Sequence, residues 1–301
     1  MKSTMERFED YWSGGDPVTM NRFLTKTITP MITIVTSYVL FVTWIGPTIM
    51  KNKKPIEMRK LIIVYNFGLI AFYLYFLLKG AFFIPELGFQ FICGSLNSYE
   101  TPIIPDIFDL GYQLYVVRYI ELLDTVFLVL TKKFNMVTPL HVFHHSIVPV
   151  FGWFGFRSES SGYLAVFMAV NCIVHIVMYT YYAIAALGPK YQKYIWWKKY
   201  LTSLQILQFF VMTFYTNIMF AIGCTTSKFT FMFCTFLSVL FFFLFINYYK
   251  QAYKSNDKEQ EAKKNGDVVN RIHETNGIHS KNVNLKNGLP AAYRNAMKKE
   301  K

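Results

Sequence analysis

The sequence predicts an all-α membrane protein with seven transmembrane helices. Hydrophobic residues make up 53% of the 301 residues and charged residues only 16%, and the mean hydropathy is positive. The charges are concentrated between long apolar runs and near the C-terminus, which is the pattern of a multi-pass membrane protein. The basic residues also fall in alternate loops, as they do when those loops lie in the cytosol. This loop pattern explains most of the formal net charge of +13, so we expect no nucleic-acid partner.

The chain divides into an N-terminal segment (1–27), a membrane domain (28–249) and a polar tail (250–301). The N-terminal segment has no apolar core of the kind found in signal peptides, so the first span is expected to anchor the protein. The tail is rich in Asn and Lys, and we expect it to be disordered. Within the membrane domain, Pro and Gly residues predict a long loop at 79–109. The seven spans are predicted at 28–50, 61–78, 111–130, 137–156, 162–187, 200–223 and 229–249.

Lysine and arginine residues set the expected orientation of the chain in the membrane. They crowd the loops that follow the first, third and fifth spans, whereas acidic residues outnumber them in the alternate loops. We therefore expect a lumenal N-terminus and a cytosolic C-terminus. The last residues, Lys298-Lys299-Glu300-Lys301, resemble the dilysine signal of retrieved endoplasmic-reticulum membrane proteins, which works only in the cytosol. The basic loop residues are Lys51, Lys53, Lys54, Arg59, Lys60, Lys132, Lys133, Lys190, Lys193, Lys198 and Lys199.

The four cysteines show neither CxxC spacing nor a framework of paired cysteines. Cys93 lies in the predicted long loop, whereas Cys172, Cys224 and Cys234 lie in apolar segments. Two of these cysteines could form a disulfide, but their spacing does not predict one.

Three histidines lie close together in the fourth predicted span, at His141, His144 and His145. At about 100° per residue, they share one face of a helix. Polar side chains at membrane depth are costly and mark functional sites. Imidazoles gathered on one face can bind metal, transfer protons or act as nucleophiles. This cluster is therefore the first candidate for an active site.

The third predicted span carries an ionic face formed by Arg118, Glu121, Asp124 and Thr125. An Arg–Glu pair one turn apart lowers the cost of burying either charge and could be purely structural. The second acid, Asp124, is harder to explain by structure alone. We expect these residues to orient the histidines or to hold substrate.

Two further helices present polar side chains that could face the histidines. The fifth predicted span has Asn171, His175 and Tyr182 on one stripe, and the sixth has Gln205 and Gln208 on one face. Glutamines in membranes often only bond neighbouring helices, so their catalytic role is left open. These faces predict a histidine-lined chamber bordered by basic loops, which suits an activated lipid with an anionic carrier.

Four motifs, in order, resemble the ELO family, the elongases of very-long-chain fatty acids. HVFHH at 141–145 matches the family's HxxHH box, and RYIELLDT at 118–125 resembles its KxxExxDT motif. NCIVHIVMYTYY at 171–182 and TSLQILQF at 202–209 are similar to its second histidine motif and its glutamine motif. Arg118 stands where lysine is usual, and Cys172 where serine is common. The resemblance covers about 16–249.

The resemblance implies a fold of seven helices, six of which ring a substrate tunnel. It implies condensation of long-chain acyl-CoA with malonyl-CoA in the endoplasmic-reticulum membrane, giving a 3-ketoacyl-CoA two carbons longer, CoA and CO2. No cofactor is expected beyond these two substrates. The expected partners are other membrane enzymes of the elongation cycle, and the protein could also form a homo-oligomer.

We assign the expected roles residue by residue. His144 is the expected nucleophile, forming an acyl-imidazole, and His175 is its nearest helper. His141 and His145 are expected to orient groups or move protons, with Glu121 and Asp124 fixing their tautomers. The expected substrate-binding residues are Arg118, Asn171, Tyr182, Gln205, Gln208, Lys132, Lys133, Lys198 and Lys199.

Three other functions were weighed against this one. A di-iron desaturase or hydroxylase also carries HxxHH boxes, but it needs more histidines than the four in this membrane region; His273 and His279 lie in the tail. A single zinc held by the histidines and Asp124 is a second alternative, although we expect no metal. A seven-helix receptor or transporter would not need clustered histidines beside an ionic helix.

Overall fold

In the computed structural model the described residues form helices joined by turns and loops, and there is no strand among them. These residues are 3, 4, 6, 8, 12–88, 93, 103–158, 162–224 and 227–254. The chain separates into two units, 1–249 and 250–301. Of the second unit only the π-helix η4 (Lys250–Lys254) is described. The predicted disorder and the dilysine signal therefore fall outside the described residues.

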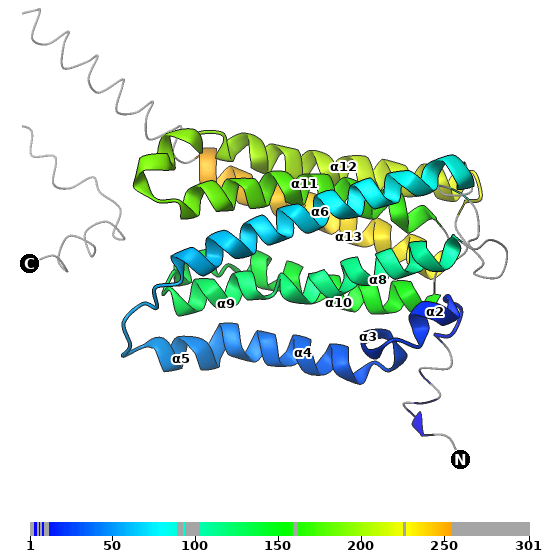
Figure 1. The fold of residues 1–301 in the computed structure, drawn as a ribbon, viewed down its shortest axis with the longest axis horizontal. Helices are drawn as coiled ribbons and strands as arrows, with labels where there is room; N and C mark the ends of the chain where they lie inside the picture. The colour runs from blue at the N-terminus through cyan, green and yellow to red at the C-terminus, as the bar shows by residue number, and fades with distance from the viewer. Residues whose placement is uncertain are drawn as a thin grey trace, which may run out of the picture. The chain divides into compact units, whose positions relative to one another are not determined.

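The first unit is a bundle of long helices preceded by two short ones (Figure 1). The elements are α2 (Pro17–Met20), α3 (Phe23–Lys26), α4 (Thr29–Leu40), η1 (Phe41–Ile45), α5 (Gly46–Met50), α6 (Arg59–Leu87), α8 (Ile104–Ile120), α9 (Leu123–Leu130), η2 (Phe134–Met136), α10 (Pro139–Ser158), α11 (Tyr163–Ala186), η3 (Pro189–Tyr194), α12 (Lys198–Ala221) and α13 (Lys228–Tyr249).

Five helical stretches among the described residues are long and apolar enough to cross a membrane. They are Thr29–Met50, Arg59–Pro85, Tyr163–Ala186, Lys198–Ala221 and Lys228–Tyr253. They confirm the first, second, fifth, sixth and seventh predicted spans, and they indicate a multi-pass membrane protein. The third and fourth predicted spans are helical as α8, α9 and α10, but these helices carry the charged and histidine side chains. The count of seven spans therefore stays a prediction.

Six of the described helical segments pack in an order that closes on itself. α6 packs against α8 and α11, and α8 packs against α10. α10 packs against α13, α13 against α12, and α12 against α11. α4 and α5 lie outside this ring, where they contact α10 and α9 (Figure 1). The histidine helix α10 is therefore a member of the ring that also contacts α4 outside it.

The prediction of a loop at 79–109 is wrong at both ends of that range. α6 continues to Leu87, and α8 already begins at Ile104. Pro85 lies in the last turn of α6, so little of the helix has to continue beyond it. Pro105 lies in the first turn of α8, where a backbone N–H has no partner within the helix. Prolines at helix ends were thus mistaken for loop residues.

The basic loops meet at one end of the bundle (Figure 1). Nε of Arg59, at the start of α6, donates to the carbonyl oxygen of Ala186 at the end of α11, at 2.9 Å. Nζ of Lys132, just after α9, donates to the carbonyl oxygen of Lys51 after α5, at 3.2 Å. The two contacts join four helix ends, and cations there also complement the carbonyl ends of the helices.

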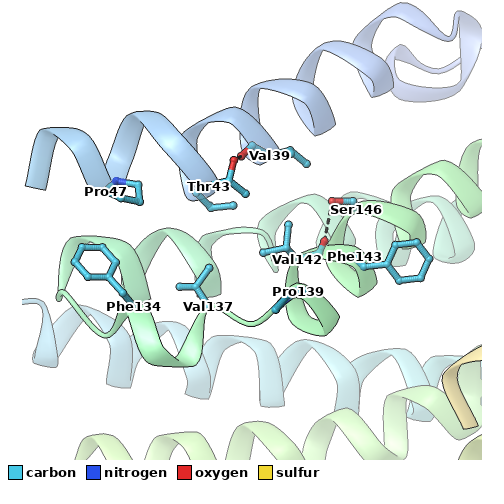
Figure 2. Close-up of a pocket in the computed structure, with 10 residues that line it drawn as sticks. Val39, Thr43, Pro47, Phe134, Val137, Pro139, Val142, Phe143 and Ser146 are labelled. Carbon is cyan, nitrogen blue, oxygen red and sulfur yellow. Dashed lines mark hydrogen bonds between the residues drawn. The ribbon is translucent and has the colours of Figure 1, made fainter. Parts of the chain in front are cut away.

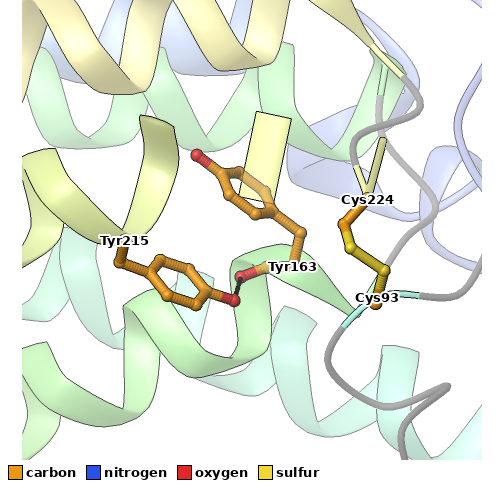
Figure 3. Close-up of a disulfide and its surroundings, with 4 residues drawn as sticks. All are labelled: Cys93, Tyr163, Tyr215 and Cys224. Carbon is orange, nitrogen blue, oxygen red and sulfur yellow. Dashed lines mark hydrogen bonds between the residues drawn. A yellow bond between two sulfur atoms is a disulfide. The ribbon is translucent and has the colours of Figure 1, made fainter. Parts of the chain in front are cut away.

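The opposite end is fastened by a disulfide and by a buried arginine. Cys93 and Cys224 form a disulfide across 131 residues of chain, which the cysteine spacing did not predict. Figure 3 shows it near Tyr163 and Tyr215, where the Tyr215 hydroxyl donates to the carbonyl oxygen of Tyr163 at 3.2 Å. Arg157, at the end of α10, donates to backbone carbonyls of the N-terminal segment at 2.7–3.3 Å.

Candidate active site

A buried ion pair lies at the junction of α8 and α9. Nη1 of Arg118 donates to Oε2 of Glu121 at 2.9 Å, and the two residues are only 5% and 3% exposed. The predicted pair is therefore present. Nη2 of Arg118 donates to Oδ1 of Asn171 on α11 at 2.7 Å. Arginine can make both bonds because its guanidinium presents several donors in a fixed plane.

Oε1 of Glu121 has three hydrogen-bond partners, which lie on two helices, α6 and α11. Oε1 accepts from the hydroxyls of Tyr73 on α6, at 2.5 Å, and of Tyr179 on α11, at 3.0 Å. The same oxygen lies 2.7 Å from Nδ1 of His175. An ionised carboxylate only accepts, so Nδ1 of His175 carries the proton in this pair. Nε2 of His175 is consequently the nitrogen with an available lone pair, suited to accept a proton.

Asp124 and Thr125 face different neighbours, although they are adjacent in the sequence. Asp124 accepts a hydrogen bond from Tyr179 at 2.8 Å, whereas the Thr125 hydroxyl lies 2.9 Å from Nε2 of His141. We expected Glu121 and Asp124 to fix the tautomers of the box histidines. Instead Glu121 holds His175, and Thr125 is the partner of His141. Adjacent helical residues point about 100° apart, which allows them to serve two different helices.

The HxxHH histidines form a compact cluster near the start of α10. The backbone N–H of His141 donates to Oγ1 of Thr138 at 3.2 Å, which satisfies one unpaired donor of the first turn. The ring centroids of His141 and His145 lie 4.4 Å apart, and those of His144 and His145 lie 5.5 Å apart. The three histidines of the predicted box are thus grouped in the structure.

His144 differs from its neighbours in its hydrogen bonding. Its Nδ1 is buried and has no hydrogen-bond partner among the described residues. Its ring packs edge-on against Phe241 of α13, with centroids 5.0 Å apart. Buried polar atoms without a partner are rare in native proteins and call for an explanation. One such explanation is that the nitrogen finds its partner atom only when a substrate is bound.

The other side of α10 borders an apolar cavity of about 630 Å³. Figure 2 shows it between α4–α5 and the segment that runs from η2 into α10. Its two hydroxyls are satisfied within their own helices: Thr43 donates to the carbonyl of Val39, and Ser146 to that of Val142. The lining residues are Val39, Val42, Thr43, Pro47, Phe134, Val137, Pro139, Val142, Phe143 and Ser146.

The GNS1/SUR4 (ELO) family model matches residues 23–261. The chain belongs to the ELO family. A rat protein named very long chain fatty acid elongase 7 is 36% identical over 276 residues, covering 91% of this chain and 98% of the relative. A mouse protein named very long chain fatty acid elongase 4 is 33% identical over 290 residues, covering 95% and 90%. A human protein named very long chain fatty acid elongase 1 is 31% identical over 268 residues, covering 87% and 95%.

The remaining predicted residues of this ELO protein lie in two places. Gln205 approaches Sδ of Met178 at 3.7 Å, and Gln208 is 5% exposed, so both amides lie within the bundle. Tyr182 is 37% exposed, with its ring 6.0 Å from that of Tyr179. The predicted lysines Lys132, Lys133, Lys198 and Lys199 lie at the basic end of the bundle instead.

The sequence reading missed two tyrosines that contact the polar cluster. Tyr73 bonds Glu121, and Tyr38 on α4 bonds Thr125 at 2.8 Å. Tyr38 is the one tyrosine of its apolar run and Tyr73 is one of three in its run, and the one available signal is that a buried phenol needs a hydrogen-bond partner. Within the part of the chain that the structure describes, no three His, Cys, Asp or Glu side chains are grouped as a metal ion would require.

Proposed function

We propose that this ELO protein catalyses the condensation step of fatty-acid elongation. Long-chain acyl-CoA and malonyl-CoA give a 3-ketoacyl-CoA two carbons longer, CoA and CO2. The names of the ELO relatives support fatty-acid elongation in general. The observation that carries the specific chemistry is the unpaired Nδ1 of His144 in a cluster with His175, whose ring is held by Glu121. This arrangement supplies a nucleophile and a base.

In the first half-reaction, His144 attacks the thioester carbonyl carbon of acyl-CoA. A carbon–nitrogen bond forms and the carbon–sulfur bond breaks, which leaves an acyl-imidazole and a CoA thiolate. Nε2 of His175 accepts the proton that the His144 ring loses and passes it to the thiolate, so CoA leaves as a thiol. Glu121 orients His175 and stabilises its transient positive charge, as a carboxylate does behind other catalytic histidines.

In the second half-reaction, malonyl-CoA loses CO2, and the carbanion formed attacks the acyl carbonyl carbon. A carbon–carbon bond forms, the bond to His144 breaks, and the ring takes up a proton that comes from solvent and is delivered through His175. The amides of Asn171, Gln205 and Gln208 are the candidates to bind carbonyl or enolate oxygens. No cofactor enters either step.

The two ends of the substrates call for different surroundings. The phosphates of CoA suit the basic end of the bundle, where Lys132, Lys133, Lys198 and Lys199 supply positive charge for charge-assisted contacts. The acyl chain suits a tunnel inside the ring of six helices, with spans three and four completing a seven-span fold. One narrow chamber favours the use of the two CoA esters in turn over holding both together.

The disulfide supports a lumenal assignment for its end of the bundle. Disulfides persist in oxidising compartments such as the lumen of the endoplasmic reticulum and are rare in the cytosol. Cys93 and Cys224 lie at the end opposite the basic loops, so two independent features give the same orientation. We propose an endoplasmic-reticulum protein with a lumenal N-terminus and a cytosolic C-terminus, working with the other membrane enzymes of elongation.

Purified protein supplied with isotope-labelled malonyl-CoA and a panel of acyl-CoAs tests the proposal. We expect a labelled 3-ketoacyl-CoA, with CO2 and CoA released in equal amounts. The His144→Ala variant, checked for the same thermal unfolding profile, should form no product. Absence of labelled 3-ketoacyl-CoA from folded wild-type protein with every acyl-CoA tested would contradict the proposal.

A further inference from the structure

A chain of hydrogen bonds enters the histidine cluster from outside the ring of helices. The hydroxyl of Tyr38, on α4, lies 2.8 Å from Oγ1 of Thr125 on α9. The same Oγ1 lies 2.9 Å from Nε2 of His141 on α10. Tyr38 is 5% exposed and Thr125 is fully buried, so bulk water does not compete for the bond between these two residues. Three helices thus meet in one line of three polar side chains.

Either hydroxyl can donate in the Tyr38–Thr125 bond, and the role of Nε2 of His141 depends on its tautomer, so we assign the directions from the chemistry of each group. Thr125 is the hydrogen-bond partner of the Tyr38 hydroxyl among the described residues, and a buried phenol is satisfied by donating its proton. In this assignment Oγ1 of Thr125 accepts a hydrogen bond from Tyr38, and the Thr125 hydroxyl donates a hydrogen bond to Nε2 of His141. Nε2 of His141 is then an acceptor, so the proton of the neutral ring lies on Nδ1.

We propose that Tyr38 is a positioning residue that acts through Thr125 to hold His141 in the Nδ1–H tautomer. In that tautomer Nε2 is occupied and cannot attack a thioester or take a proton. Nδ1–H is a donor on a ring whose centroid is 4.4 Å from that of His145. His141 therefore serves the site as a fixed donor. Its part in catalysis rests on the proposed function, whereas its tautomer does not.

Packing around α4 and α5 supports this role for a helix pair outside the ring. Val42 is 1% exposed and Val129 of α9 is fully buried, so α4–α5 and α9 are in tight contact. Gly46 permits that approach, because an added Cβ there would lie 2.7 Å from Cγ1 of Val129. The first span thus does more than anchor the chain, since it holds the Tyr38 hydroxyl against Thr125.

Nitrogen NMR of the full-length protein reads the tautomer directly. The chain has six histidines, so ¹⁵N-histidine labelling gives a simple spectrum, and the His141→Gln variant assigns the signals of His141. At a pH where the ring is neutral, we expect an unprotonated Nε2 and a protonated Nδ1. Tyr38→Phe and Thr125→Val should each lose this fixed pattern, whereas Thr125→Ser, which keeps the hydroxyl, should retain it.

A matched control separates the effect of the hydrogen-bonded chain Tyr38–Thr125–His141, the relay, from a general loosening of the bundle. Tyr215→Phe removes another phenol hydroxyl, one that donates to a backbone carbonyl beside the disulfide. It should leave the His141 signals unchanged. With substrates, Tyr38→Phe should lower kcat by roughly tenfold at constant KM for acyl-CoA, since one buried hydrogen bond is lost.

Three results would overturn the inference. They are a protonated Nε2 in wild-type His141, an unchanged tautomer in both Tyr38→Phe and Thr125→Val, and an equal loss of the pattern in Tyr215→Phe. Because the NMR measurement needs no turnover, a failure of the proposed condensation would not alter it. A fixed tautomer with no acyl transfer would contradict the proposed function and leave the relay standing.

Discussion

Nδ1 of His175 lies 2.7 Å from Oε1 of Glu121, so a carboxylate at the α8–α9 junction holds an imidazole on α11. The same carboxylate is paired with Arg118 at 2.9 Å, and all three residues are buried. Glu121 thus belongs both to a structural ion pair with Arg118 and to a catalytic pair with His175, whose Nε2 can accept a proton. Replacing Glu121 should therefore affect stability through Arg118 and activity through His175, and the two effects can be measured separately.

Glu121→Gln should lower kcat by at least about a hundredfold, because the amide no longer stabilises a positively charged His175. It should also destabilise the fold by about 3–5 kcal/mol, because Arg118 is left buried without its counter-charge. Adding Arg118→Gln should restore part of the stability and none of the activity. Thermal unfolding and initial rates measure the two effects, and normal turnover by Glu121→Gln would contradict the role given to it.

Arg118→Lys should fold and retain part of its activity, because lysine is usual at this position in the motif that the sequence resembles. A single ammonium can keep the bond to Glu121, but it cannot also keep the bond from Nη2 to Asn171. Asn171→Ala should then cost activity in the wild type and little in the Arg118→Lys background. A double-mutant cycle of initial rates measures this coupling, and additive effects would show that the second bond does not matter.

Neutralising the lysines of the basic end should weaken CoA binding more than it slows chemistry. Lys132→Gln with Lys133→Gln, and Lys198→Gln with Lys199→Gln, should raise KM for both CoA substrates with little change in kcat. Lys228→Gln, at the start of α13 and the opposite end of the bundle, is the matched control and should leave KM unchanged. Equal KM values in all variants would leave these lysines with a topological role only.

Loss of the disulfide should destabilise the bundle without touching the histidines. Cys93→Ser should lower the free energy of unfolding by roughly 2–4 kcal/mol, since the bond closes a long loop. Cys224→Ser should match it, and the double variant should add nothing further. Thermal unfolding measures the loss, and maleimide labelling before and after reduction checks the bond. A Cys93→Ser variant as stable as wild type would contradict this expectation.

The sequence predicted groups that repeat with a helical period and missed groups that meet only through the fold. The three box histidines share a helix face, and Arg118 and Glu121 are one turn apart, so local spacing was enough to group them. Tyr38 and Tyr73 lie in apolar runs, and their partners lie on other helices. No local pattern could indicate these contacts.

The sequence also did not predict the disulfide or the ends of α6 and α8. Cys93 and Cys224 are 131 residues apart, and the connectivity of distant cysteines is decided by the packing of helices and not by their spacing. Pro85 and Pro105 indicated a loop because proline disfavours helix interiors, yet both lie at helix ends. The third predicted span is divided between α8, of 17 residues, and α9, of 8 residues, and the fourth is α10, which carries the box histidines, so five of the seven predicted spans are confirmed.

Release of CoA from acyl-CoA alone tests the central claim most directly, with intact-protein mass spectrometry of the same sample. In the absence of malonyl-CoA, we predict a burst of CoA of one per active site and a protein mass increased by one acyl group, with His144 as the modified residue. His144→Ala should show neither signal, whereas Gln205→Ala should show both and slow only the full cycle. If wild-type protein releases no CoA and gains no mass until malonyl-CoA is added, the covalent mechanism is wrong.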